Sequence, residues 1–173
     1  MVSRSFPLLL ALLVVCGCGS QPSAKENPFV ESSVQQVGED LRLQGRVNDA
    51  AGILDFKTEQ ALADKLLALE TRTHHQVVVA TTPSLGKQDI STYTLAVARR
   101  WGIGRKGHND GVVIMVAPNE RKVRIEVGYG LEKVLTNQVC GQIIGQNMVP
   151  RFKLGDFPKG LQDGVDALIV KLS

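Results

Sequence analysis

Two acidic side chains and a glycine-rich turn are the residues of this chain best suited to bind a ligand. Asp110 precedes an apolar run at 112–116, and Glu132 follows a run at 122–127 that alternates charged and apolar residues. If the two runs pair as an antiparallel hairpin, both acids meet at one end of a sheet, beside Gly128-Tyr129-Gly130. Carboxylates near backbone carbonyls suit hard cations such as Ca²⁺ or Mg²⁺. The spacing therefore predicts a cation site, with paired acids that are only solvated as the alternative.

The other residues capable of chemistry favour structural roles. Cys140 lies in an apolar helical stretch, which predicts a buried and unreactive thiol. Asp156 is expected to cap a helix, and Tyr129 to pack at the end of a strand. The three histidines lack the spacing of a metal site, and the sequence contains no phosphate-binding loop and no Ser-His-Asp order.

The elements that must position these residues alternate between strand and helix. A β-branched run at 76–81 predicts a buried strand, and residues 47–52 indicate a turn-rich start. Helices are expected over residues 56–73, 90–101, 137–152 and 158–172. The patterns predict an α/β fold, a compact sandwich with a central mixed sheet flanked by helices and including one antiparallel hairpin.

The amino terminus predicts export. Arg4 precedes an unbroken apolar run from Phe6 to Val15, which is too short to span a bilayer as a helix but has the length of a signal-peptide core. The run ends at Gly17-Cys18, which resembles the processing box of bacterial lipoproteins. Residues 1–17 are therefore predicted to be a lipoprotein signal peptide and Cys18 the lipidation site. A plain cleaved signal peptide is the alternative.

The next segment, residues 18–44, is polar and aperiodic and predicts a flexible tether before a folded domain at 45–173. About 25 flexible residues have a root-mean-square reach of roughly 25–30 Å. Two or more acyl chains on Cys18 would anchor the protein stably to a membrane. We therefore expect an extracytoplasmic domain held at a bacterial membrane, the outer membrane facing the periplasm if the host is Gram-negative, as Gly19 after Cys18 favours.

Composition narrows the class of partner. The formal net charge is +3, and no basic stripe is interleaved with aromatic residues, so nucleic-acid binding is not expected. With Cys16 removed and Cys18 acylated, Cys140 has no partner for a disulfide.

Several motifs follow one another in an order typical of one known family: Val47-Asn48-Asp49-Ala50-Ala51-Gly52, Trp101-Gly102-Ile103-Gly104, Asn109-Asp110-Gly111-Val112, the run 121–132, and Gly155-Asp156-Phe157. Through them, residues 44–172 resemble the TPM domain, a family of exported and often membrane-attached α/β domains. The resemblance implies a central sheet flanked by helices, with an acidic cleft that can hold a divalent metal. Carried over residue by residue, it implies Asp49, Asp110 and Glu132 as metal ligands, with Ca²⁺ or Mg²⁺ as the ion.

The chain departs from the family pattern at three places. Asn109-Asp110-Gly111 stands where the family often has Asp-Asn-Gly, Lys133 where glycine is usual, and Asn137 where an aspartate is common. These departures shift one carboxylate, add a positive charge at the expected cleft and remove one acid.

Two functions remain open. The first is a membrane-tethered binding or accessory module of the cell envelope that contacts envelope proteins, with a divalent cation as a possible ligand. The second is a metal-assisted phosphomonoesterase, because a TPM member of the thylakoid lumen is associated with acid phosphatase activity. The sequence has no identifiable nucleophile or general base, and this favours the binding module.

Overall fold

The computed structural model describes residues 41–173. Leu41 is only 5% exposed, and its carbonyl accepts hydrogen bonds from the side chains of Arg100 (2.7 Å) and Trp101 (3.2 Å). Leu41 therefore packs on the domain, although the composition of residues 18–44 placed it in the predicted tether. The predicted signal peptide at 1–17, the lipidation site Cys18 and most of the tether lie outside the described residues.

Within residues 41–173, one mixed sheet of four strands forms the centre, in the order β1-β2-β3-β4. Strands β1 (Val47–Asp49), β2 (Gln76–Thr81) and β3 (Gly111–Ala117) run parallel. Strand β4 (Lys122–Val127) returns antiparallel to β3, and the register pairs Val112 with Val127. The predicted mixed sheet with one antiparallel hairpin is confirmed.

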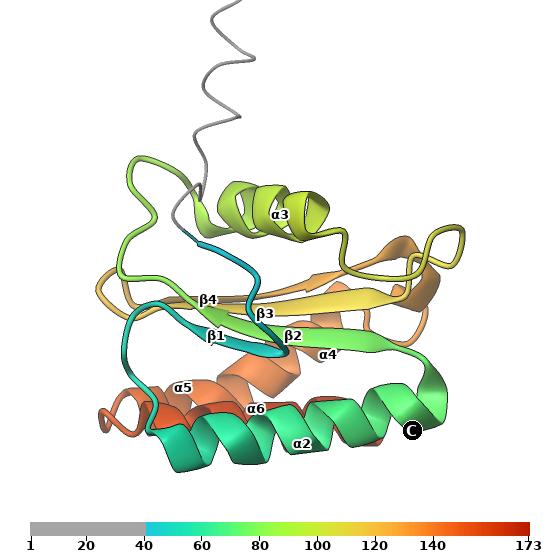
Figure 1. Cartoon of the computed structure of the whole chain (residues 1–173). Coiled ribbons are helices and arrows are strands. Elements are labelled where there is room, and N and C mark those ends of the chain that lie inside the picture. The colour runs from blue at the N-terminus through green and yellow to red at the C-terminus, as the bar shows by residue number, and fades with distance from the viewer. Residues whose placement is uncertain (1–40) are drawn as a thin grey trace, which may run out of the picture.

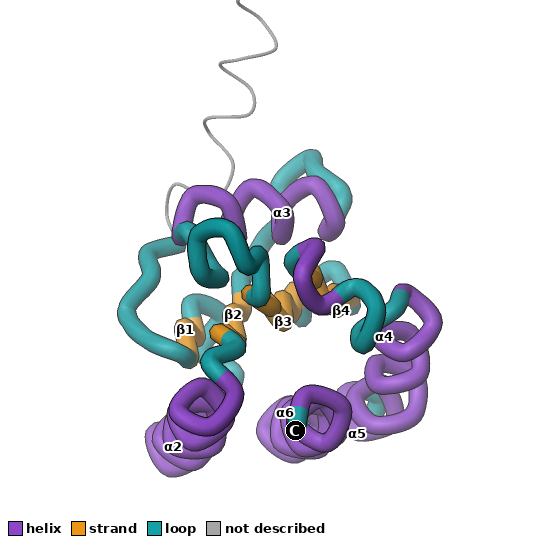
Figure 2. The backbone as a smooth tube through the Cα atoms, turned by 90° about the vertical axis from the view of Figure 1, so that its right-hand side faces the viewer, coloured by secondary structure: helices purple, strands orange, loops and turns teal. Residues whose placement is uncertain are grey.

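Helices cover both faces of the sheet (Figures 1 and 2). Helix α3 (Ile90–Trp101) covers one face, and the other face carries α2 (Phe56–Thr73), α4 (Asn137–Ile143), α5 (Val149–Phe152) and α6 (Phe157–Leu172). A 3₁₀ turn, η1 (Tyr129–Leu131), follows β4. No helix in residues 41–173 combines the length and apolarity needed to cross a bilayer.

Each helical layer has its own hydrophobic core against the sheet. The larger core includes Leu62, Leu66 and Leu69 of α2 together with Leu161, Val165 and Leu168 of α6. The smaller core joins Tyr93 and Val97 of α3 to Ala80, Met115 and Ala117 of the sheet. Because both faces of β3 are covered, all of its residues are buried, which accounts for its uninterrupted apolar sequence.

Two elements differ from the prediction. Residues 47–49, expected as part of a turn-rich start, form β1 and pair in parallel with β2. The helix expected over residues 137–152 is interrupted by a π-helical segment, η2 (Ile144–Met148), between α4 and α5. Pro150 explains the interruption, because proline has no N–H to donate to the carbonyl four residues earlier.

Candidate functional site

The hairpin register brings the segment before β3 against the segment after β4. The Gly128 N–H donates to the Gly111 carbonyl at 2.8 Å, and the Gly130 N–H donates to the Asn109 carbonyl at 3.0 Å. The predicted convergence of the backbone around Asp110 with the glycine-rich turn is therefore confirmed.

Glycines make this close approach possible. A Cβ atom on Gly128 would lie 2.2 Å from the Asn109 carbonyl oxygen, and one on Gly130 would lie 2.0 Å from the His108 carbonyl oxygen. No side chain fits at such separations. The two glycines therefore join the loop before β3 to the turn after β4, and this closely packed backbone, of which Gly128 lines the cleft, forms the floor of the site.

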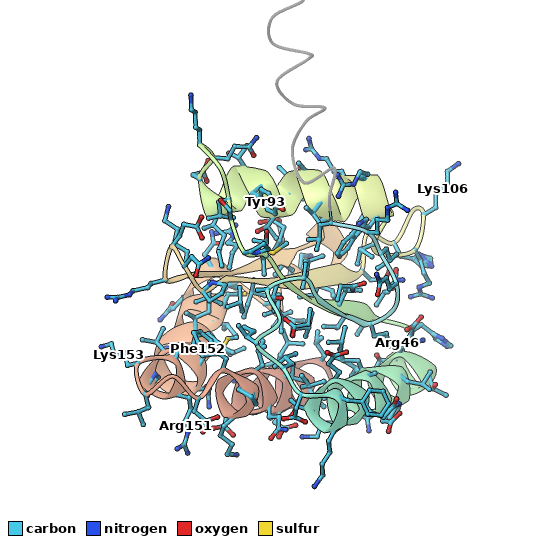
Figure 3. The ribbon with its side chains drawn as sticks, turned by 60° about the vertical axis from the view of Figure 1, so that its left-hand side comes forward. Arg46, Tyr93, Lys106, Arg151, Phe152 and Lys153 are labelled. Carbon is cyan, nitrogen blue, oxygen red and sulfur yellow. The ribbon has the colours of Figure 1, made fainter. Side chains whose placement is uncertain are left out.

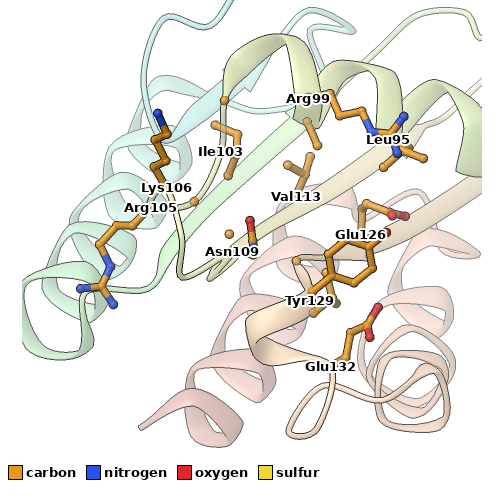
Figure 4. A pocket seen from close by; sticks show the side chains of 16 residues that line it. Leu95, Arg99, Ile103, Arg105, Lys106, Asn109, Val113, Glu126, Tyr129 and Glu132 are labelled. Atoms are coloured by element: carbon orange, nitrogen blue, oxygen red, sulfur yellow. The ribbon is translucent and has the colours of Figure 1, made fainter.

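A cleft of about 600 Å³ opens beside this floor, between α3, β4 and the loop before β3. Figure 4 shows Glu126, Tyr129 and Glu132 along one wall and Lys106 on the opposite side, with Asn109 between them. Arg99 and Arg105 also line the cleft. Side chains of both charges therefore surround it.

Tyr129 and Glu126 differ in whether their side chains are engaged by a neighbour. Tyr129 is 76% exposed, so it does not pack at the end of the strand as expected but presents its ring at the cleft. The Glu126 carboxylate forms an ion pair with Arg124 at 2.9 Å.

Asp110 lies beside the cleft floor but is not among the residues that line the cleft. Its side chain is buried. Oδ1 accepts a hydrogen bond from the Arg105 backbone N–H (2.8 Å), and Oδ2 accepts two from the Arg105 guanidinium, Nε at 2.7 Å and Nη2 at 2.6 Å. Burial raises the pKa of Asp110, but the hydrogen bonds and charge of Arg105 outweigh burial and hold that pKa below its ordinary value. Asp110 therefore braces the loop before β3.

Asp49 lies at the other end of the sheet. The register pairs Asp49 with Thr81 at the carboxyl end of β2, whereas Gln76, at the amino end of β2, pairs with Gly111. The two ends of β2 are about 16 Å apart at 3.3 Å per residue. The Asp49 carboxylate accepts hydrogen bonds from the Thr81 hydroxyl and from the Leu54 N–H at 2.8 Å.

The three predicted ligands do not share one cation site. Asp49 is at the far end of the sheet, both Asp110 oxygens are held by Arg105, and only Glu132 lines the cleft. Within the described part of the chain, no three His, Cys, Asp or Glu side chains converge in a way that could hold a metal ion. The donor set therefore does not fit an ion held jointly by these residues, and cation binding at Glu132 alone stays a prediction.

Two neighbouring residues differ in whether they line the cleft. Asn109 lines the cleft, and Asp110 does not. Where the expected pattern has a carboxylate at the first of these positions, this chain has an amide. The carboxylate of this pair holds Arg105, and the amide lines the cleft.

Cys140 has the structural role expected for it. Its side chain is buried, its Sγ lies 3.7 Å from the Leu135 carbonyl oxygen, and burial raises the pKa of the thiol. A raised pKa keeps the thiol protonated and a poor nucleophile near neutral pH.

Comparison with known proteins gives a family and a fold. The model of a family described as the TPM domain matches residues 47–171. The N-terminal domain of a P. gingivalis protein, solved by NMR, is 35% identical with a TM-score of 0.69, over 73% of this chain and 80% of that chain. Comparison with curated protein sequences finds no match.

Two further solved structures share the fold. A protein of the psychrophilic bacterium Bizionia argentinensis is 22% identical with a TM-score of 0.61, over 69% of this chain and 81% of that chain. The N-terminal domain of a Corynebacterium glutamicum protein is 15% identical with a TM-score of 0.60, over 76% of this chain and 82% of that chain.

Proposed function

The chain belongs to the TPM domain family, and we propose that it works as a membrane-tethered, extracytoplasmic binding module that recognises an envelope protein through the cleft between α3 and β4. The observation that carries the proposal is the lining of that cleft, which combines Tyr129, Arg99 and Lys106 with Glu132 and Glu126 over a floor of closely packed backbone. Tyrosine and arginine side chains contribute most of the energy at many protein interfaces.

The mixture of charges indicates the kind of partner. Cationic and acidic side chains around one exposed aromatic ring complement a polypeptide that carries both charges, and they disfavour a partner of a single sign. The exposed Tyr129 ring supplies an apolar anchor that loses little conformational freedom when it is covered.

Cross-linking tests the cleft directly. A photoreactive phenylalanine analogue in place of Tyr129 should capture an envelope protein in cells of the native host. The matched control carries the same analogue at Phe56, which is 80% exposed on α2, in the layer on the opposite face of the sheet. Adducts of equal yield at both positions, or adducts unaffected by Arg99→Ala, would contradict the proposal.

Anchoring rests on the sequence alone. The apolar run before Gly17-Cys18 and the polar segment after it support acylation of Cys18, and a tether allows the domain to reach partners near the membrane. Cys18→Ser should move the protein from the membrane fraction to the soluble fraction and abolish incorporation of a labelled fatty acid. Retention of Cys18→Ser in the membrane fraction would refute the anchor.

A phosphomonoesterase finds less support in the same cleft. The acids predicted to hold its metal lie apart or are engaged by Arg105. The cations that line the cleft are accompanied by Glu126 and Glu132, whose negative charge opposes a phosphate ester. We therefore expect the purified protein to release no phosphate from p-nitrophenyl phosphate, with or without added Mg²⁺ or Ca²⁺. Turnover that requires the metal and is lost in Glu132→Gln would reverse the ranking.

A further inference from the structure

A second cavity, of about 520 Å³, opens at the other end of β3 and on the other face of the sheet. The end of β3 and the start of β4 form one side of it, and α5 and the start of α6 form the other. Its volume lies within the range of small-molecule sites in proteins. It shares no lining residue with the cleft described above.

The walls of this cavity are hydrocarbon. Val116 and Val123 line it from the hairpin, and Val149, Phe152 and Phe157 line it from the helices. The rings of Phe152 and Phe157 pack with their centroids 5.2 Å apart. Val116 belongs to the larger core, and Val123, Phe152 and Phe157 pack against it, so the cavity borders that core.

Its mouth is cationic. Arg121, Lys122 and Lys153 line the cavity, and every other lining residue within 41–173 is apolar or glycine, so none of these residues adds an acidic or neutral polar side chain. In the described part of the chain no ion pair engages Arg121 or Lys153. Lys122 lies close enough to Asp89 and Glu120 to interact with their carboxylates. Figure 3 shows Lys153 at the outer edge of the domain and Phe152 turned inward.

Arg121 occupies an unusual backbone position. It ends the hairpin turn, donating its N–H to the Pro118 carbonyl at 3.1 Å, and its φ is 54°. Glycine or asparagine adopts this left-handed conformation most readily, whereas a long side chain there carries a strain cost. An arginine at this place holds a guanidinium at the mouth of the cavity where a neutral residue would make the easier turn.

We propose that this cavity binds a single-chain amphiphilic anion, with a hydrocarbon tail among the valines and phenylalanines and a carboxylate or phosphate head between Arg121 and Lys153. A tail of hydrocarbon fits because the lining side chains other than Arg121, Lys122 and Lys153 have no group that could hydrogen-bond to an amide or a hydroxyl group. A charged head fits because, among residues 41–173, no carboxylate forms an ion pair with Arg121 or Lys153. The inference is independent of the function proposed for the cleft.

Titration with dodecanoate, below its micelle concentration, tests both halves of the proposal. Followed by calorimetry and by amide chemical shifts, dodecanoate should bind and shift the resonances of residues 116–123 and 149–157. Dodecyl maltoside has the tail without the charge, and acetate and inorganic phosphate have the charge without the tail. Each of these should bind at least about tenfold more weakly, because a tenfold change needs only the loss of one good contact.

Variants distinguish binding of the charged head by Arg121 and Lys153 from nonspecific hydrophobic binding. Arg121→Asn removes the cation and keeps a residue suited to the positive φ, so the melting temperature should stay the same or rise while dodecanoate binding weakens. Combined with Lys153→Gln, it should weaken binding by about tenfold or more. The matched control is Lys171→Gln, which removes an exposed lysine at the far end of α6 and should leave binding unchanged.

Three outcomes would overturn the proposal. The first is equal affinity for dodecanoate and dodecyl maltoside, and the second is an unchanged affinity in the double variant. The third is binding to phosphatidylglycerol vesicles without binding to monomeric dodecanoate, which would indicate a surface contact with a charged membrane instead of an occupied cavity.

Discussion

Asp110→Asn should destabilise the domain without removing the Glu132 carboxylate from the cleft. Asparagine keeps Oδ1 for the Arg105 N–H and loses the two bonds that Oδ2 accepts from the guanidinium. A hydrogen bond to a charged group contributes about 1.5–3 kcal/mol. The Arg105 side chain is 47% exposed, so water replaces part of the loss, and the net cost should be about 2 kcal/mol. For a domain of this size, that corresponds to a fall of about 6–10 °C in melting temperature.

The pH dependence of the unfolding free energy also reports the contribution of Asp110. The pKa of Asp110 is lowered on folding, so its stabilisation is complete above the unfolded aspartate pKa of about 3.9 and is lost as the pH falls through the lower folded-state pKa. The difference in unfolding free energy between wild type and Asp110→Asn should therefore be constant near neutral pH and shrink below about pH 4. Urea unfolding at a series of pH values measures this difference.

A Ca²⁺ titration completes the test. Any response of the Glu132 amide resonance to Ca²⁺ should persist in Asp110→Asn and disappear in Glu132→Gln, because Glu132 lines the cleft and Asp110 does not. An Asp110→Asn variant that unfolds at the wild-type urea midpoint but no longer responds to Ca²⁺ would refute the assignment of Asp110 as a loop brace.

Three further substitutions test the packing and the separation of the sites. Gly128→Ala places a Cβ atom 2.2 Å from the Asn109 carbonyl oxygen, so it should cost about 1–3 kcal/mol in urea unfolding. Asp49→Asn loses part of a two-sided hydrogen-bond network and should cost about 1 kcal/mol without altering the Ca²⁺ titration. Gly160→Ala places a Cβ atom 2.5 Å from the Phe152 ring, so it should displace that wall of the second cavity and weaken dodecanoate binding, as amide shifts and calorimetry will report.

Local signals in the sequence predicted most of the fold. Asp55, Asp89 and Asp156 each precede a helical pattern, and each caps the helix expected after it. The hairpin followed from two strand patterns joined by a short turn. The strand at 47–49 was missed because it is three residues long and includes two polar residues, and it exists only through pairing with β2, some thirty positions along the chain.

The candidate site was harder to predict because side-chain direction depends on loop conformation. The hairpin placed the backbone around Asp110 correctly, but Asn109 has a φ of 51°, and Asn109 is the residue that lines the cleft. The partner Arg105 lies in the same loop, and nothing in the sequence distinguishes it from its cationic neighbours. The second cavity was beyond prediction, since its walls come from the hairpin, α5 and α6 and form only when these pack together.

The direct contact of backbone with backbone at Gly128 and Gly130 has a consequence for the proposed recognition of a partner at the cleft. A base made of hydrogen-bonded main chain cannot adjust its shape without breaking the bonds that close it, whereas Tyr129 and Lys106 project from exposed positions and can change rotamer. When a partner binds, only a few side chains then lose conformational freedom. Affinity can accordingly be retuned by exchanging those side chains, with the platform beneath them left as it is.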